Sequence, residues 1–174
     1  MGKAVDLTGV ERFFDKNEII VSKTDLKGHI TYANRTFLDI ADYTEEEALG
    51  APHSLIRHPG MPRCVFQLLW DTIQAKKEIF AYVVNRAKHG DHYWVLAHVT
   101  PSFDAEGQID GYHSNRRVPD RSIVEGKIIP LYKTLLAEEE RHANRKDGMK
   151  SATGILVNLL QKKGIGYDEF IFSL

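Results

Sequence analysis

Three consecutive runs of alternating apolar and polar residues, joined by short turns, constrain the fold of this chain most. Residues Phe80–Arg86 precede a His89-Gly90-Asp91 turn, and Tyr93–Phe103 follows it as a long alternating run. A second turn at residues 104–107 leads into Ile109–Arg117. Successive runs joined in this way pair side by side in opposite directions. The second half of the domain is therefore predicted to be three antiparallel strands.

Two further strands are predicted near the N-terminus, at residues 19–24 and 29–33, on either side of a turn. Short helices are expected after Asn34, in an N-cap position, and after Thr44, which has capping-box spacing to Glu47. A longer helix from Pro62 to about Ala75 carries an apolar stripe of Val65, Phe66, Leu69, Trp70 and Ile73. The expected fold class is α+β, with a five-stranded antiparallel sheet and short helices on one face.

The character of the chain changes at Ser122. A helix is expected near residues 128–136, with Pro130 bending it or marking its start, and a second over Ser151–Lys163. The charged segment 138–147 is expected to lie in solvent, and Gly148 to act as a helix stop. We therefore divide the chain into an N-terminal arm (1–18), a central domain (19–121) and a C-terminal helical extension (122–174).

Composition and net charge limit the partners and the cellular compartment expected for this chain. The net charge of -1 over 174 residues gives no basis for nucleic acid as a partner. A single cysteine, Cys64, fits a reducing, cytoplasmic compartment. No apolar run approaches the roughly 18 residues that span a bilayer, so no direct membrane span is expected.

Several motifs together resemble one family. They are the stretches 24–37 and 50–53, Arg57-His-Pro, Met61-Pro, Asn85-Arg and Gly90-Asp-His-Tyr-Trp-Val95. The pattern resembles the PAS domain of bacterial aerotaxis receptors from about Ile19 to Arg121. The resemblance implies a PAS fold that binds FAD noncovalently and reports cellular redox state. The family usually has an acidic residue where this chain has Gly60, which puts an acidic contact at that point in doubt.

The loop before the long helix carries the first candidate ligand-binding residues. Arg57 can form paired hydrogen bonds to a phosphate, and His58 can add a donor. The alternative is that both lie on a solvated loop. Arg116 and Arg117 are weaker candidates, because paired basic residues at a strand end usually lie on the surface.

The remaining candidates lie on the helix and the strands. The resemblance implies that Trp70 packs near the flavin ring, although a core tryptophan is the alternative. Asn85 is a polar residue in a strand, and a flavin edge would supply its hydrogen bonds. Asn34 and Asn115 raise the same choice, with a helix cap as the alternative for Asn34.

The long alternating run has two faces, and one must line the pocket. Tyr93, Val95, Ala97 and Val99 share one face, and Trp94, Leu96, His98 and Thr100 the other. We favour Trp94 as cofactor-facing, on resemblance alone. The predicted cofactor-binding set is Asn34, Arg57, His58, Trp70, Asn85, Trp94, His98 and Asn115.

Other cofactors are weighed against flavin. The chain lacks a zinc-binding motif, so no metal site is expected. A haem needs one axial histidine, for which His53, His58 and His98 are the candidates. Light-driven formation of a cysteine–flavin adduct, as in LOV domains, is not expected. The stretch 50–53 resembles the LOV loop that carries the reactive cysteine, but it has His53 at that place, and Cys64 lies later, in the long helix.

The expected function is a non-enzymatic FAD-binding sensor of redox or oxygen status. Its signal would pass to a homodimer or to a partner of chemoreceptor or kinase type. The extension is expected to transmit the signal, with a stabilising lid as the alternative. A haem-binding gas sensor and a cofactor-free dimerisation module are the competing functions.

Overall fold

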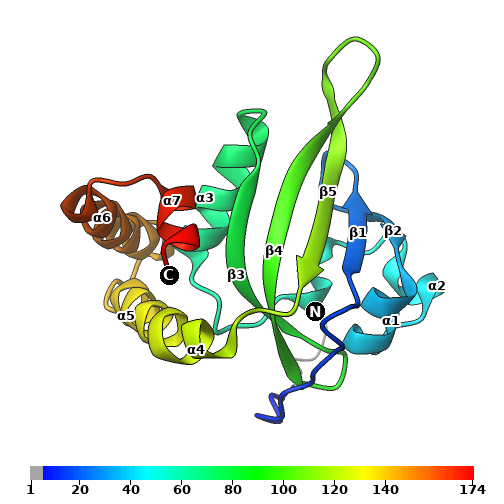
Figure 1. The fold of residues 1–174 in the computed structure, drawn as a ribbon, viewed down its shortest axis with the longest axis horizontal. Coiled ribbons are helices and arrows are strands. Elements are labelled where there is room, and N and C mark those ends of the chain that lie inside the picture. Colours follow the sequence, from blue (N-terminus) through cyan, green and yellow to red (C-terminus); the bar gives the residue numbers. More distant parts are fainter. Residues whose placement is uncertain (1–5) are drawn as a thin grey trace.

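A five-stranded antiparallel sheet forms the centre of the molecule (Figure 1). The computed structural model describes residues 6–174; residues 1–5 of the predicted arm lie outside the described residues. The strands lie in the order β2-β1-β5-β4-β3. They are β1 (Ile20–Thr24), β2 (Ile30–Ala33), β3 (Ile79–Arg86), β4 (His92–Phe103) and β5 (Ile109–Arg117). The α+β fold predicted from the alternating runs is confirmed.

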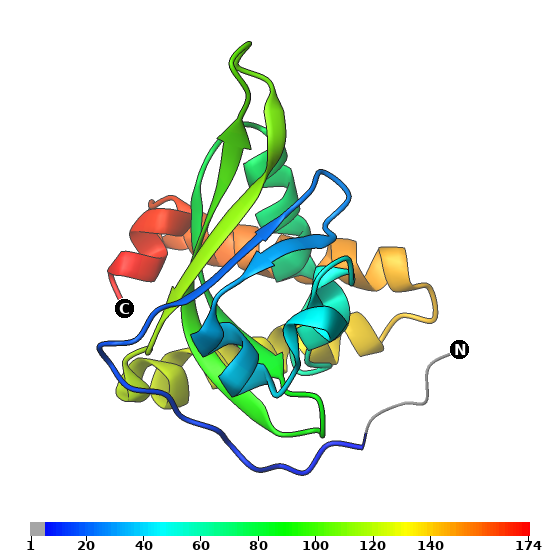
Figure 2. The same ribbon diagram turned by 90° about the vertical axis from the view of Figure 1, so that its right-hand side faces the viewer.

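Short helices cover one face of this sheet (Figure 2). They are α1 (Arg35–Ala41), α2 (Glu45–Ala48), the 3-10 turn η1 (His53–Ile56) and α3 (Arg63–Gln74). The Asn34 side chain caps α1 by accepting from the Phe37 N–H, and Thr44 and Glu47 form the predicted capping box of α2. In α3, Val65 and Ile73 of the predicted stripe are buried against the sheet.

The C-terminal helices gather beside β3, an edge strand (Figure 1). They are α4 (Arg121–Ile123), the π-helical turn η2 (Val124–Ile128), α5 (Ile129–Glu140), α6 (Arg145–Lys163) and α7 (Tyr167–Phe172). The buried Tyr132 of α5 donates a hydrogen bond to the Tyr82 carbonyl of β3. The Phe172 ring packs 4.7 Å from Phe80 on the same strand. Covering an edge strand in this way prevents it from pairing with another chain.

One expectation about the start of α6 is wrong. Gly148 does not stop a helix, because α6 runs through it from Arg145. A Cβ atom at Gly148 would come 2.3 Å from the Glu139 carbonyl oxygen, so glycine is what allows α5 and α6 to approach there. The segment 138–147 is mostly exposed, as predicted, but Glu139 is the exception and is only 3% exposed.

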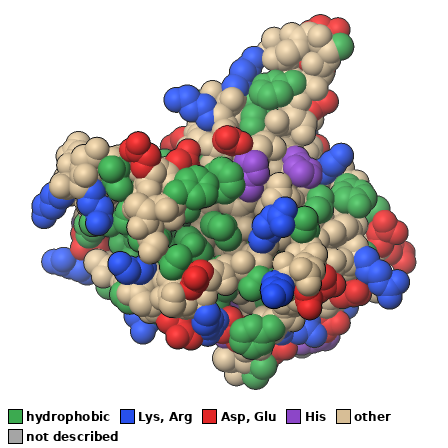
Figure 3. Space-filling model, in the orientation of Figure 1, with side chains coloured by type: hydrophobic (Ala, Val, Ile, Leu, Met, Phe, Trp, Pro, Cys, Tyr) green, Lys and Arg blue, Asp and Glu red, His purple; other side chains and the backbone are tan. Residues whose placement is uncertain are grey.

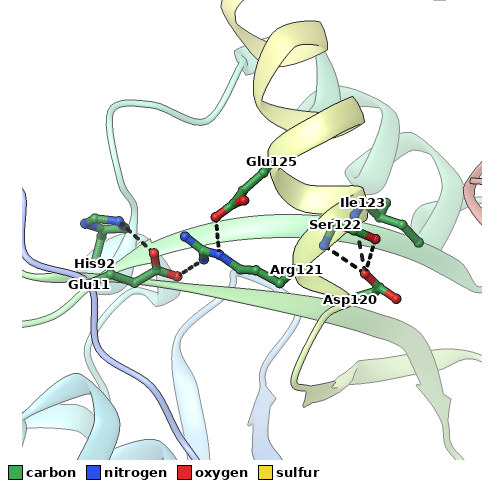
Figure 4. Close-up of polar contacts among 7 residues, drawn as sticks. All are labelled: Glu11, His92, Asp120, Arg121, Ser122, Ile123 and Glu125. Atoms are coloured by element: carbon green, nitrogen blue, oxygen red, sulfur yellow. Dashed lines mark hydrogen bonds and ion pairs between the residues drawn. The ribbon is translucent and has the colours of Figure 1, made fainter.

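The N-terminal arm is extended and lies beside the first residues of β4. Backbone hydrogen bonds join Thr8 to Gly90, and both Val10 and Arg12 to His92. Figure 4 shows Glu11 of the arm between His92 and Arg121, with Arg121 also paired to Glu125. One charged cluster therefore holds the arm, β4 and the first C-terminal helix together.

The outward face of the sheet is partly open. Figure 3 shows histidine and apolar side chains next to one another on this side of the molecule. His98 stacks on Phe80 with ring centroids 4.1 Å apart, and the His98 ring also pairs with Glu78. Among residues 6–174, no helix is long and apolar enough to cross a membrane.

Candidate ligand-binding cavity

A cavity of about 480 Å³ lies between the inner face of the sheet and the helices that cover it. This volume falls in the range of about 300–1,000 Å³ that small-molecule sites occupy. Its walls come from β1, β3, β4, β5, η1, α3 and α6. The sheet side is lined by alternate strand residues, among them Ser22, Thr24, Val83, Asn85, Ala97, Val99, Tyr112, Ser114 and Arg116.

This lining resolves which face of β4 meets the cavity. Ala97 and Val99 line it, so the face that begins with Tyr93 is the inner one. Trp94 belongs to the opposite face, where its ring lies 6.1 Å from Tyr132 of α5. The expectation that Trp94 faces the cavity is therefore corrected. The sequence could not separate the two faces because both are rich in apolar residues.

Asn85 lies on the cavity wall with an unsatisfied polar group. The residue is 4% exposed, and its Nδ2 has no hydrogen-bond partner in the structure. Such a group costs about 1–3 kcal/mol unless something in the cavity accepts from it. The backbone of Asn85 also bridges to Arg57, which ties the strand to the loop before α3. Asn85 is thus where a ligand would gain a specific hydrogen bond.

Aromatic and cationic side chains form the opposite side of the cavity. Trp70 of α3 lies 5.4 Å from Tyr112 with the two rings nearly perpendicular. The Arg57 guanidinium sits 4.5 Å from the Phe66 ring centroid. Arg57 is exposed, and Arg63 and Lys27 also line the cavity. This side of the cavity therefore combines flat apolar walls with the cations Lys27, Arg57 and Arg63, which suit an anionic group.

A polar cluster around Arg116 forms another part of the wall. The Arg116 Nη2 donates to Ser22 Oγ at 2.5 Å and to His53 Nε2 at 2.8 Å. The His53 ring must be neutral to accept this bond, and burial, reinforced by the Arg116 charge, lowers the pKa of His53 to about 3. Arg116 was a weaker candidate in the sequence. Its alternation with Tyr112 and Ser114 on β5 was the signal for an inward side chain.

His58 lies outside the cavity lining, although its loop borders the cavity. Its Nδ1 accepts from the Gly60 N–H at 2.9 Å, and its ring lies 5.7 Å from His92. A Cβ atom at Gly60 would come within 2.8 Å of that same Nδ1. Glycine at position 60 therefore permits the His58 ring to fold back over its own loop.

Three asparagine and histidine candidates also lie outside the cavity lining. Asn34 caps α1 and donates from Nδ2 to the Ile19 carbonyl, which satisfies its amide locally. His98 and Asn115 lie on the outward face, with 3.4 Å between Asn115 Nδ2 and His98 Nδ1. Of the eight predicted residues, the structure brings Arg57, Trp70 and Asn85 together at the cavity.

The C-terminal helices contribute to the site in two ways that the sequence did not reveal. Met149 of α6 lines the cavity. Glu139 of α5 accepts from the backbone N–H groups of Arg63 and Cys64, and so caps α3. Pro62, the N-cap residue, makes no side-chain hydrogen bond to α3, and Glu139 acts instead from 75 residues away. The N-terminus of α3 favours a negative charge.

Cys64 lies in the core and outside the cavity lining. The residue is 1% exposed, and burial together with Glu139 raises the pKa of its thiol to about 12. A thiol that stays protonated is a poor nucleophile. Among residues 6–174, no group of three histidine, cysteine, aspartate or glutamate side chains is placed to hold a metal ion.

The architecture is that of a known protein family. Residues 30–115 match the model of the PAS fold. These residues form a PAS domain. The PAS domain overlaps a 119-residue match, 44% identical, to the aerotaxis receptor of Escherichia coli K12; the match covers 68% of this chain and 23% of the receptor. Phototropin-2 of Oryza sativa subsp. japonica is 27% identical over 107 residues, which are 62% of this chain and 12% of phototropin-2.

Solved structures agree on the fold. The dark structure of the Aureochrome1 LOV blue-light photoreceptor superposes with a TM-score of 0.57 and 21% sequence identity, over 66% of this chain and 86% of that one. The 44% identity to the aerotaxis receptor confirms the resemblance predicted from the sequence motifs. Because the chain spans less than a quarter of the aerotaxis receptor, the comparison concerns one domain of that protein.

Proposed function

We propose that the cavity of this PAS domain binds FAD noncovalently and that the domain senses redox or oxygen status. The observation that carries the proposal is the unpaired Asn85 amide on the wall of a cavity that Trp70 also lines. A flat ring with polar edges fits both features. Arg57 and Arg63 offer paired hydrogen bonds to a phosphate group, and two phosphates distinguish FAD from FMN.

When bound, a flavin supplies redox chemistry in which its ring nitrogen N5 changes from hydrogen-bond acceptor to donor. The Asn85 amide can meet either state, because it offers a carbonyl oxygen and an NH₂ group. Exchanging one for the other requires the side chain to rotate. The backbone bridge to Arg57 then gives the loop before α3 a means to respond.

The response would leave the domain through the helices of residues 122–174. Met149 of α6 lines the cavity, and Glu139 of α5 caps the N-terminus of α3. These helices therefore contact the cavity wall directly. We propose that residues 19–121 sense and that the extension transmits, to a second copy or to a partner of chemoreceptor or kinase type. The identity to part of an aerotaxis receptor supports this role in the cytoplasm. The function is signalling rather than enzymatic.

The first test is the visible spectrum of freshly purified protein before and after dithionite. A flavin gives broad near-ultraviolet and blue bands that bleach on reduction. Chromatography of the ligand released by heating then separates FAD from FMN. A sharp Soret band would instead establish haem, and His53, which lines the cavity, would be the first histidine to replace. A colourless protein that also fails to take up added FAD would refute the proposal.

A further inference from the structure

The least expected group in the cavity wall is a buried arginine. Arg116 of β5 is 2% exposed. Its Nη2 makes the hydrogen bonds to Ser22 and His53, and its Nη1 is buried with no hydrogen-bond partner among residues 6–174. One arm of the guanidinium is thus fixed in place, and the other is free to donate.

No carboxylate of residues 6–174 forms an ion pair with Arg116. Its neighbours are neutral: His53 has a strongly lowered pKa, and burial raises the pKa of Tyr93 well above its usual value. The Phe37 ring lies 5.5 Å from the guanidinium. Burial lowers the pKa of Arg116 itself to about 10, which leaves it charged at neutral pH.

A buried charge without a counter-charge is unfavourable. The bonds to Ser22 and His53 could be made by a neutral donor. A full positive charge on the cavity wall is better explained by a ligand that carries negative charge at this point. A cation here is also distinct from Arg57, which is exposed.

We propose that Arg116 donates from Nη1 to the bound flavin ring and favours the form of the ring that carries negative charge. This inference rests on the proposed function and deepens it. Two electrons from an external donor, taken up with one proton, add one negative charge to the cavity. Arg116 is placed to balance that charge, so it sets how readily the domain responds to a change in redox poise.

The test compares Arg116→Gln with Arg117→Gln in the full chain loaded with FAD. Arg117 is the next residue on β5 and is exposed, so the control removes the same charge one position away. Midpoint potentials are measured by spectroelectrochemical titration, and dissociation constants for oxidised FAD by fluorescence. We expect Arg116→Gln to weaken reduced FAD at least tenfold more than oxidised FAD, which lowers the potential by about 30 mV for a two-electron couple. Arg117→Gln should leave it unchanged.

Thermal unfolding without ligand separates this role from a structural one. Arg116→Gln should melt at or above the wild-type temperature when ligand-free, because an unpaired buried charge has been removed. It should gain less from added FAD than wild type does. Lower ligand-free stability with an unchanged potential would make Arg116 structural and overturn the proposal.

The outcomes are distinguishable. A wild-type chain that takes up no flavin refutes the proposed function, and this inference with it. A wild-type chain that binds FAD while Arg116→Gln keeps its potential overturns this inference alone. Should Arg116→Gln fail to fold, Arg116→Met, of similar length and apolar, is measured in its place. If neither folds, Arg116 is required for the fold and the inference is overturned.

Discussion

At the scale of single residues, the cavity wall carries polar atoms, among them Asn85 Nδ2 and Arg116 Nη1, that have no hydrogen-bond partner within residues 6–174. Asn85→Ala should weaken FAD binding roughly tenfold or more, because a buried hydrogen bond to the ligand is worth about 1–3 kcal/mol. Asn115→Ala removes the same side chain from the outward face and should leave the dissociation constant within about twofold. Fluorescence titration with FAD measures both. Equal losses in the two variants would contradict the placement of the ligand at Asn85.

His53 makes the ligand-free fold sensitive to acid. Its folded pKa, about 3, lies below its ordinary value of 6.5, so the unfolded chain binds a proton that the folded chain does not. The contribution of neutral His53 to the free energy of unfolding is therefore fully present above pH 6.5 and is lost as the pH falls from 6.5 toward 3. We expect the melting temperature to fall by up to about 4 °C per pH unit over this range.

His53→Gln keeps a side-chain acceptor for Arg116 but does not titrate. Calorimetry or circular dichroism should show a shallower pH dependence for this variant in the upper part of that range, before carboxylates protonate. A slope equal to that of wild type would show that His53 is not the titrating group.

At the scale of elements, α3 is held by a residue of another helix. Glu139→Ala should destabilise the protein by about 1–3 kcal/mol, because two backbone N–H groups lose their acceptor in a buried position. Glu140→Ala, at the exposed neighbouring position, should change stability by less than about 0.5 kcal/mol. Urea unfolding measures the difference. Equal effects would refute the capping role of Glu139.

The elements also show what a sequence can and cannot predict. The strands and the caps at Asn34 and Thr44 follow from local patterns, so they could be predicted. Glu139 and Gly148 could not, because a run of three glutamates looks like a solvated surface and a glycine after it looks like a stop. Their roles come from the crossing of α5 and α6, which only the folded chain brings together. Trp94 was misplaced for a related reason, since helices cover the outward side of its strand as well.

At the scale of the whole molecule, the extension is part of the cavity. Deletion of residues 145–174 removes Met149 from the cavity wall and takes away the buried Leu156, Phe170 and Ile171. We expect a lower melting temperature and FAD binding at least about tenfold weaker, since burying each large apolar side chain contributes about 1.5–3 kcal/mol.

Met149→Ala in the full chain tests the contribution of Met149 to the cavity wall separately from the contribution of α6 and α7 to the fold. It should weaken FAD binding with little change in ligand-free stability, measured by the same titration and melting curves.

Met149 also has a consequence for biosynthesis. A nascent chain that has emerged as far as Arg117 already contains every strand of the sheet, along with Asn85, Trp70 and Arg116. It still lacks the residue that α6 adds to the cavity wall and the glutamate that caps α3. Domains fold from the N-terminus as the ribosome releases them, at about 5–20 residues per second. We therefore expect the proposed ligand to be held fully only after α5 and α6 have been translated.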